Sequence, residues 1–494
     1  MTLGILTNVS GLAAQRSLAE SQKLMDTAME RLSSGQRINS ASDDAAGLAT
    51  AMRMESQIRG LDMAVKNTVD GQAMVQAIEG ALSEVDAMLQ RMRELAVQSA
   101  NGTLRVTDRQ YIEAEKDALV AEIDRIQANT TFNGVKVFDG LLNTSFQVGA
   151  DSSQSISMSQ GSIASSVLGA YRIAEGPQSL TAAGATVPVT TVTASEDLTI
   201  TNTVTNASAT TAATAGDTAK ATATAVNALT STTGVVAEAK TRAVVSFTHS
   251  ESINLTIGSS GGATAATGAI AVTTSSYAAL VSAINSISGT TGVTAELAGS
   301  GTQFYITDAD GDDITLVRTD TATGSLAVQT VEDDGTTTVN TAATVQVANS
   351  NDSLRIQGMV AFSGADSFTV ASAGTPTNGY VSAASVSASQ NAVSSLDLTT
   401  IAKAGVALTT ISGAIEKIAD MRADLGAVDN RLDHTQSSLL NISEATSAAK
   451  SKITDADFAT ESANLSKAQV LQQAGTAMLA QANASPQMVL QLIQ

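Results

Sequence analysis

The sequence predicts a multidomain protein: an all-α core of coiled coils or a helical bundle formed by both chain ends, with a small β-hairpin region, and β-rich outer domains from the middle. Apolar residues near both ends recur at alternating steps of three and four, and the middle consists of short strand-like segments rich in Thr, Ser, Ala and Val. Residues 1–150 contain 19 acidic and 14 basic side chains, residues 151–400 contain 19 and 6, and residues 401–494 contain 9 and 7. Balanced ends suit packing against copies of the same surface, and an acidic middle suits solvent.

The N-terminal block predicts three helices. The first has Leu18, Met25 and Leu32 seven residues apart, and Gly35 is expected to end it. The second is expected to begin after Ser42 or Asp43 as N-cap. It contains an unbroken 3.5-residue repeat, which is typical of a coiled coil: Leu61, Ala64, Thr68, Gly71, Val75, Ile78, Leu82, Val85, Leu89, Met92 and Ala96. A third helix contains Leu119, Ile123 and Ile126.

The C-terminal block repeats this pattern over a longer stretch. Its seam consists of Ala404, Ala407, Ile411, Ala414, Ile418, Met421, Leu425, Val428, Leu432, Thr435, Leu439, Ile442, Thr446, Ala449 and Ile453. A helix of about 50 residues is a rod of roughly 75 Å, which needs a partner of similar length. We therefore expect it to pair with the seam from Leu61 to Ala96.

A last helix is expected from Phe458 to about Ala484, ended by Pro486. Its apolar arc consists of Leu465, Ala468, Leu471, Ala474, Met478 and Ala482.

The middle has a period of two and an internal repeat. Asn133-Gly134 predicts a hairpin turn, after which Val135 and Val137 alternate with polar residues. The segments 225–238 and 283–296 share the pattern Ala-x-Asn-x-x, Thr-Thr-Gly-Val and Ala-Glu, 58 positions apart. Each copy, at about 195–240 and 252–298, predicts a strand, a short helix, a turn and a strand, which indicates a duplicated small domain.

Several function classes are disfavoured by the residues themselves. The chain contains no Cys, and its two histidines, His249 and His434, stand in no metal-ligand spacing. A net charge of −20 argues against nucleic-acid binding. The first residues lack the pattern of a cleaved signal, and no stretch has the apolar length of a membrane span. We expect no enzyme activity, no cofactor and no metal, and we interpret the acidic segment Thr307–Asp313 as a solvated hairpin turn rather than a calcium loop.

Long motifs at both ends resemble those of bacterial flagellins. Residues 32–49 (LSSGQRINSASDDAAGLA), 90–101 (QRMRELAVQSAN) and 132–135 (FNGV) match the N-terminal pattern of that family. Residues 425–428 (LGAV), 455–459 (DADFA) and 471–483 (LQQAGTAMLAQAN) match its C-terminal pattern. The resemblance covers roughly residues 1–175 and 395–494.

The resemblance implies a secreted, extracellular subunit that polymerises with itself into the flagellar filament. It implies an inner coiled-coil domain from 1–40 with 455–494, a helical-bundle domain from 41–176 with 399–454, and a surface-exposed outer block at 177–398. The implied partners are the flagellar type III export apparatus and its chaperone, filament cap and hook-associated proteins. A hook–filament junction protein and, less favoured, a secreted adhesin on flagellin-type ends remain as alternatives.

Two groups of functional residues follow. The assembly residues are Val75, Ile78, Leu82, Val85, Leu89, Ile418, Leu425, Leu432, Leu439 and Ile442 in the seams, and Leu18, Met25, Leu465, Leu471 and Met478 in the terminal helices. The resemblance also implies recognition by host Toll-like receptor 5 through Arg91, Leu95 and Glu115. Counting 100° per residue places Arg91 and Leu95 together and away from the seam, so Leu95 is expected to be an exposed apolar side chain.

Overall fold

A computed structural model gives the fold of the chain. It describes residues 8–173, 180–183, 197–212, 216–248, 253–260, 266–272, 276–298, 303–318, 325–331, 343–345, 353–373, 380–381 and 384–493. His249 and the outer boundary at residue 177 lie outside these ranges. The chain forms two compact units: a terminal unit of Met1–Val75, Thr144–Met158 and Gly426–Gln494, and a central unit of Gln76–Asn143 and Ser159–Leu425. The expected three-domain division stays a prediction.

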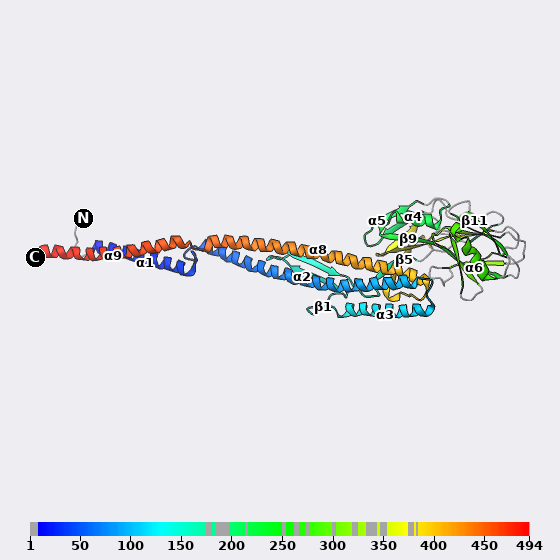
Figure 1. Ribbon diagram of the computed structural model, residues 1–494. Helices are drawn as coiled ribbons and strands as arrows, with labels where there is room; N and C mark the ends of the chain where they lie inside the picture. Colours follow the sequence, from blue (N-terminus) through cyan, green and yellow to red (C-terminus); the bar gives the residue numbers. More distant parts are fainter. Residues whose placement is uncertain are drawn as a thin grey trace. The chain divides into compact units, whose positions relative to one another are not determined.

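The first and last helices pair in the terminal unit. Helix α1 (Val9–Ser34) is capped by the Asn8 side chain and ends at Gly35, which has a positive φ of 71° that glycine adopts without strain. Helix α9 (Phe458–Ile493) lies beside it in the opposite direction (Figure 1). Two hydrogen bonds show this: Asn8 at the start of α1 bonds to Ala482 late in α9, and Arg31 near the end of α1 bonds to Glu461 at the start of α9.

The expected end of the last helix at Pro486 is wrong. Helix α9 continues to Ile493. A proline removes one backbone donor from the ladder and disfavours the helical interior, yet the bonds on either side of it can still form. The sequence signal for a stop was therefore weaker than we inferred.

Two long helices, α2 (Ala45–Ser99) and α8 (Ile401–Thr454), each contribute residues to both units. Helix α2 begins after Asp44, whose carboxylate accepts from the Gly47 amide at 2.9 Å. Its apolar repeat is buried as the 3.5-residue period predicts, with Ile78, Leu82, Val85 and Leu89 each 0% exposed. On α8, the buried apolar residues are Ala404, Ala407, Ile411, Ala414, Ile418, Leu425, Leu432 and Leu439.

Helix α3 (Val106–Asn129) follows α2 and leads into short hairpins. Strands β1 (Thr131–Phe132) and β2 (Val135–Lys136) are joined by Asn133 and Gly134, both with positive φ, so the predicted turn is confirmed. Strands β3 (Leu142–Gln147) and β4 (Ser155–Gln160) pair with each other.

The middle of the chain forms three larger sheets among the described residues. One has the order β11-β10-β14-β17-β6, and a third has the order β20-β19-β7-β8. The second has the order β12-β13-β9-β18-β5-β21, with β15 also paired to β9 and β16 paired to β15. The strands are β5 (Gly169–Ile173), β6 (Leu180–Ala183), β7 (Leu198–Asn202), β8 (Ser208–Thr211), β9 (Val235–Thr248), β10 (Ile253–Ser260), β11 (Ala266–Val272), β12 (Val293–Leu297), β13 (Phe304–Asp308), β14 (Asp313–Arg318), β15 (Ser325–Thr330), β16 (Ala343–Val345), β17 (Ser353–Ile356), β18 (Met359–Gly364), β19 (Phe368–Ser372), β20 (Ser385–Ser387) and β21 (Ser389–Ala392). Short helices are α4 (Ala219–Asn227), α5 (Thr230–Thr233), α6 (Tyr277–Ser286) and α7 (Ser288–Thr291), and a 3₁₀ turn η1 spans Val393–Ser395.

The two sequence copies adopt the same arrangement, one inserted into the other. The inner copy runs continuously through β10, β11, α6, α7, β12, β13 and β14. The outer copy begins with β7, β8, α4, α5 and the first half of β9, and returns after the insertion as β18 and β19. In both copies the helix asparagine bonds to the following strand: Asn227 and Asn285 accept from the amides of Ala237 and Ala295 at 2.7 Å.

Each copy has its own apolar core. Leu255, Ile257, Leu280, Ile284, Phe304 and Ile306 belong to the core of the inner copy, and Leu198, Ile200, Val226, Val235, Phe362 and Phe368 to that of the outer copy. Alternate strand residues and the buried helix faces supply both sets, as a sheet covered by a helix requires.

Candidate assembly interface

The terminal helices meet along one narrow seam each. On α1 the least exposed positions are Gly11, Ala14, Leu18, Ser21, Met25, Ala28 and Leu32, at alternating steps of three and four. On α9 they are Glu461, Leu465, Ala468, Gln472, Gly475, Leu479 and Ala482. A Cβ at Gly475 would lie 3.4 Å from Leu18 Cδ1, an ordinary van der Waals contact, so Gly475 faces Leu18 in the seam. Arg31 pairs with Glu461 at 3.0 Å, and Gln22 with Gln472 at 2.8 Å.

Three expected members of the α9 arc, Leu471, Ala474 and Met478, lie outside this seam. Leu471 is 42% exposed and Met478 is 63% exposed, because the contact line follows Gln472, Gly475 and Leu479 instead. In this part of the helix the contact line lies one residue later than the expected arc. The Leu471 and Met478 side chains add to an exposed apolar surface rather than to the contact within the chain.

The α2–α8 seam in the terminal unit brings distant segments together. Leu61, Ala64 and Leu439 form one buried cluster. Farther along, Leu432 is 0% exposed, and its Cδ1 lies 3.3 Å from where a side chain at Gly71 would begin. The ring of Phe146 from β3 closes the same spot at 3.2 Å.

The expectation that Ile442 lies in the buried seam is wrong, because its side chain is 43% exposed. After Leu439 the less exposed positions are Ser443, Thr446, Ala449, Lys450, Ile453 and Thr454. The later seam positions Thr446, Ala449 and Ile453 stay on the contact side, so the deviation is confined to the turn around Ile442. Ser443 occupies the expected place and donates to Asp62 at 3.3 Å.

In the central unit, charged residues accompany the seam. Arg422 of α8 pairs with Glu79 of α2 at 2.7 Å and lies 3.6 Å from Asp86. None of these three residues belongs to the apolar repeat, although charges flanking a seam are a known sequence signal for helix pairing.

A second polar group joins α3 to the segment between η1 and α8. The buried Lys116 ammonium donates to the Leu396 carbonyl at 2.6 Å and pairs with Glu113 and Asp117 at 2.7 Å. Arg109 donates to the carbonyls of Ser99 and Asn101, which satisfies acceptors at the end of α2. Neither cation stands in a recognisable motif, so the sequence alone did not reveal them.

The face expected for receptor recognition is only partly exposed. Arg91 pairs with Glu94 and with Glu115 of α3, each at 2.8 Å, and the Arg91 side chain is 48% exposed. Leu95 is only 1% exposed, so the expectation that it projects into solvent is wrong. It lies one helical turn from both Arg91 and Ser99, which bond to α3, and α3 therefore covers it.

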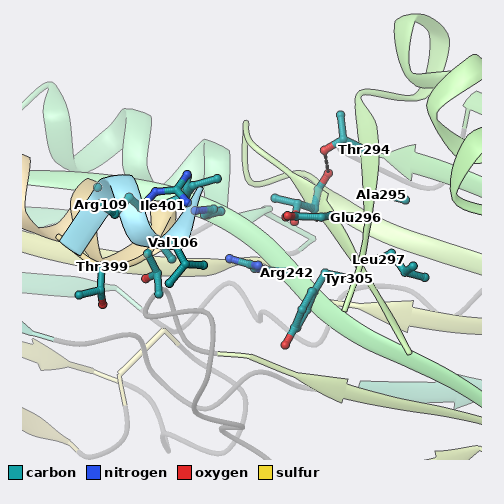
Figure 2. A pocket seen from close by; sticks show the side chains of 15 residues that line it. Val106, Arg109, Arg242, Thr294, Ala295, Glu296, Leu297, Tyr305, Thr399 and Ile401 are labelled. Atoms are coloured by element: carbon teal, nitrogen blue, oxygen red, sulfur yellow. Dashed lines mark hydrogen bonds between the residues drawn. The ribbon is translucent and has the colours of Figure 1, made fainter. Parts of the chain in front are cut away.

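A cleft of about 460 Å³ lies in the central unit between β-strands and the starts of α3 and α8 (Figure 2). Arg242 lies over the ring of Tyr305, with its guanidinium carbon 4.7 Å from the ring centroid. The lining residues include no His, Cys or Ser that could act as a nucleophile–base pair. Across the described residues, no group of three His, Cys, Asp or Glu side chains could hold a metal ion.

None of the described helices combines the length and apolar content needed to cross a membrane.

Comparisons with known proteins agree with this architecture. The family model of the bacterial flagellin N-terminal helical region matches residues 5–143, and that of the C-terminal helical region matches residues 408–493. Over 100% of both chains, the protein is 37% identical to a B-type flagellin of Pseudomonas aeruginosa and 31% identical to polar flagellin A of Vibrio parahaemolyticus. It is 35% identical to a flagellin of Salmonella typhimurium over 99% of each chain.

The similarity to solved structures is weaker than the similarity to these sequences. FliC from Burkholderia pseudomallei has 18% sequence identity and a TM-score of 0.31, with 73% of this chain and 99% of that chain covered. The flagellar hook associated protein-3 from Legionella pneumophila has 12% identity and a TM-score of 0.34, with 81% and 98% covered. These scores are too low to distinguish a filament subunit from a junction protein, whereas the full-length sequence matches do so. Paired helical ends, matching family regions and full-length relatives together establish that this chain belongs to the bacterial flagellin family.

Proposed function

We propose that this chain polymerises into the bacterial flagellar filament through the outward faces of its terminal helices. It is an extracellular structural subunit, and its partner is a second copy of itself. The observation that supports this assignment most directly is the exposure of apolar side chains along α1 and α9 away from their common seam: Leu12 60%, Leu24 56%, Val470 64%, Leu471 42% and Met478 63%.

Such surfaces favour association with further copies. The seam between α1 and α9 covers one side of each helix and leaves these side chains in water. Burying a Leu or Met side chain contributes roughly 1.5–3 kcal/mol, so several of them per subunit provide a substantial drive toward assembly.

Charge substitutions on this outward face test the assignment. Leu24→Glu and Met478→Glu should leave the monomer folded, because neither side chain lies in the seam, and should abolish polymerisation seen by electron microscopy. Gln15→Glu, at an exposed polar position of α1, is the matched control and should still form filaments. Normal filaments from both apolar-to-charged variants would contradict the proposal.

The same reasoning supports three functional regions. Residues 1–40 with 455–494 would form the inner coiled-coil domain, residues 41–176 with 399–454 the helical bundle, and residues 177–398 the outer domains. The seam residues from Val75 to Leu89 and from Ile418 to Leu439 would stabilise the subunit, while Leu471 and Met478 would contact neighbours. An enzymatic activity is not part of the proposal, since filament growth requires none.

The remaining partners follow from membership in the family. The export apparatus and its chaperone would handle the chain before assembly, and cap and hook-associated proteins would contact the filament ends. We also propose that Toll-like receptor 5 recognises the Arg91–Glu115 pair, with the buried Leu95 holding α2 against α3 behind it. This proposal is supported by the exposure of the ion pair and by the resemblance of residues 90–101 to the family pattern.

Receptor signalling by purified monomer tests this contact. Arg91→Ala and Glu115→Ala should each reduce signalling without lowering the melting temperature. Leu95→Ala should reduce both signalling and thermal stability, because it empties a buried position. Full signalling by all three variants would assign this face to the filament alone.

A further inference from the structure

The acidic turn between β13 and β14 is packed against the outer copy, contrary to the solvated hairpin that we expected. The Lys220 amide at the start of α4 donates to the Gly311 carbonyl at 3.3 Å, and its ammonium pairs with Asp310 and Asp312 at 3.0 Å. A side chain at Gly311, which has a φ of 80°, would lie 2.4 Å from Ala239 Cβ. We use "the joint" for the turn Asp308–Asp313 together with its contacts on α4 and on the crossover 355–359.

Asp313 occupies the centre of the joint and is 0% exposed. Its Oδ1 accepts from the Gly358 amide at 3.1 Å. Its Oδ2 lies 3.6 Å from Arg355 Nε and has no hydrogen-bond partner among the described residues. Gly358 is the residue at which the chain leaves β17 of the inner sheet and enters β18 of the outer copy, so one carboxylate connects the turn to the crossover.

The charges around Asp313 are mostly negative. Asp308 and Asp312 lie on its own turn, Arg355 approaches from β17, and Lys220 at α4 is engaged by Asp310 and Asp312. The other titratable groups nearby are Tyr380, whose hydroxyl donates to the Asp217 carbonyl at 3.2 Å, and Asp217 itself. Burial raises the pKa of Asp313 to about 6, opposed by the Gly358 hydrogen bond and Arg355, while Asp312 and Asp308 raise it further.

We propose that the joint is a proton-responsive latch, in which protonation of the Asp313 carboxyl holds the inner copy more firmly against the outer copy. A buried carboxylate with two further carboxylates nearby is costly when charged, by more than its 3.6 Å pairing with Arg355 recovers, and the neutral form removes this cost. The outer block would accordingly be stiffer in mildly acidic surroundings and looser in neutral ones.

The pH window follows from the direction of the shift. The folded pKa lies above the ordinary value of 3.8, so the stabilisation is complete below that value and disappears as the pH rises through about 6. If Asp313 regains its ordinary pKa in the opened joint, the opening equilibrium constant should rise roughly tenfold between pH 5 and pH 7.5.

Hydrogen exchange by mass spectrometry on the full-length monomer measures this opening. The probe is a peptide spanning Ser353–Gly364, with exchange times corrected for the intrinsic pH dependence and a peptide from α2 as internal reference. The wild-type crossover should lose about tenfold protection between pH 5 and pH 7.5, and Asp313→Asn should show no such change. A flat wild-type profile would overturn the proposal.

A matched pair of substitutions tests whether Asp313 is the titrating group even if Asp313→Asn does not fold. Asp310→Asn and Asp312→Asn each remove one carboxylate from Lys220, but only Asp312 acts on the Asp313 carboxyl. Asp312→Asn should therefore lower the midpoint pH of the wild-type transition, and Asp310→Asn should leave it in place. Equal midpoints in both variants would show that the transition belongs to another group.

Discussion

Leu432→Ala tests the packing of the two long helices at a point where three distant segments meet. Leu432 from α8 is fully buried between Gly71 of α2 and the ring of Phe146 in β3. Gly71 has no side chain with which to fill the gap, and the Phe146 ring is held within a strand. We therefore expect a cavity that collapses only in part.

The expected loss in the free energy of unfolding follows from the size and burial of the Leu432 side chain. Leu→Ala substitutions at fully buried sites cost about 2–5 kcal/mol, and the larger values belong to sites that cannot collapse. For a cooperative unit of 150–250 residues, each kcal/mol lowers Tm by roughly 2–4 °C. The variant should therefore melt about 4–20 °C below the wild type.

Circular dichroism of the full-length monomer at 222 nm measures this difference. Leu440→Ala on the same helix is the control, because Leu440 is 51% exposed and its truncation leaves no cavity. Leu432→Glu should prevent formation of the bundle and of filaments, since it also places a charge in the seam. Coincident melting curves for Leu432→Ala and Leu440→Ala would refute the packing described above.

Three further predictions concern whole segments. Removing the chain from Phe458 onward should give a soluble monomer that does not polymerise in electron micrographs, because α1 loses its partner; filaments from this variant would contradict the role of the terminal helices. Replacing residues 241–358 by Asn-Gly should leave the outer copy folded by two-dimensional NMR, because Lys240 and Met359 pair directly across the β9–β18 ladder. An unfolded outer copy would argue against the nested arrangement. Replacing residues 177–398 by a short Gly/Ser linker should still allow filaments, thinner in micrographs, and complete loss of assembly would show that the middle is needed for polymerisation.

Much of the helical part could be predicted from the sequence. The steps of three and four placed Ile78, Leu82, Val85 and Leu89 on one buried face, and the motif at Gly35 marked where the first helix ends. These features depend on local geometry, because side chains three and four positions apart lie on the same side of any helix.

Other assignments depended on contacts that no local pattern contains. Ile442, Leu471 and Met478 are exposed because the contacts between the helices run through Ser443, Gln472 and Leu479, each one position later. The helical periodicity places Leu95 away from the seam of α2, but α3 folds back over α2 and covers it.

For the middle of the chain, the repeated residues showed that a unit is duplicated, because the same helix asparagine and Thr-Thr-Gly turn recur 58 positions apart. They did not show that one copy interrupts the other, since that depends on β18 pairing with β9 across more than one hundred intervening residues. Likewise, the sequence identified an acidic turn, but only the packing of that turn against α4 and the crossover 355–359 buried Asp313. Periodicity and composition are properties of neighbouring residues and can be read from the chain directly, whereas the pairing of distant segments is selected by the burial that the whole fold makes possible.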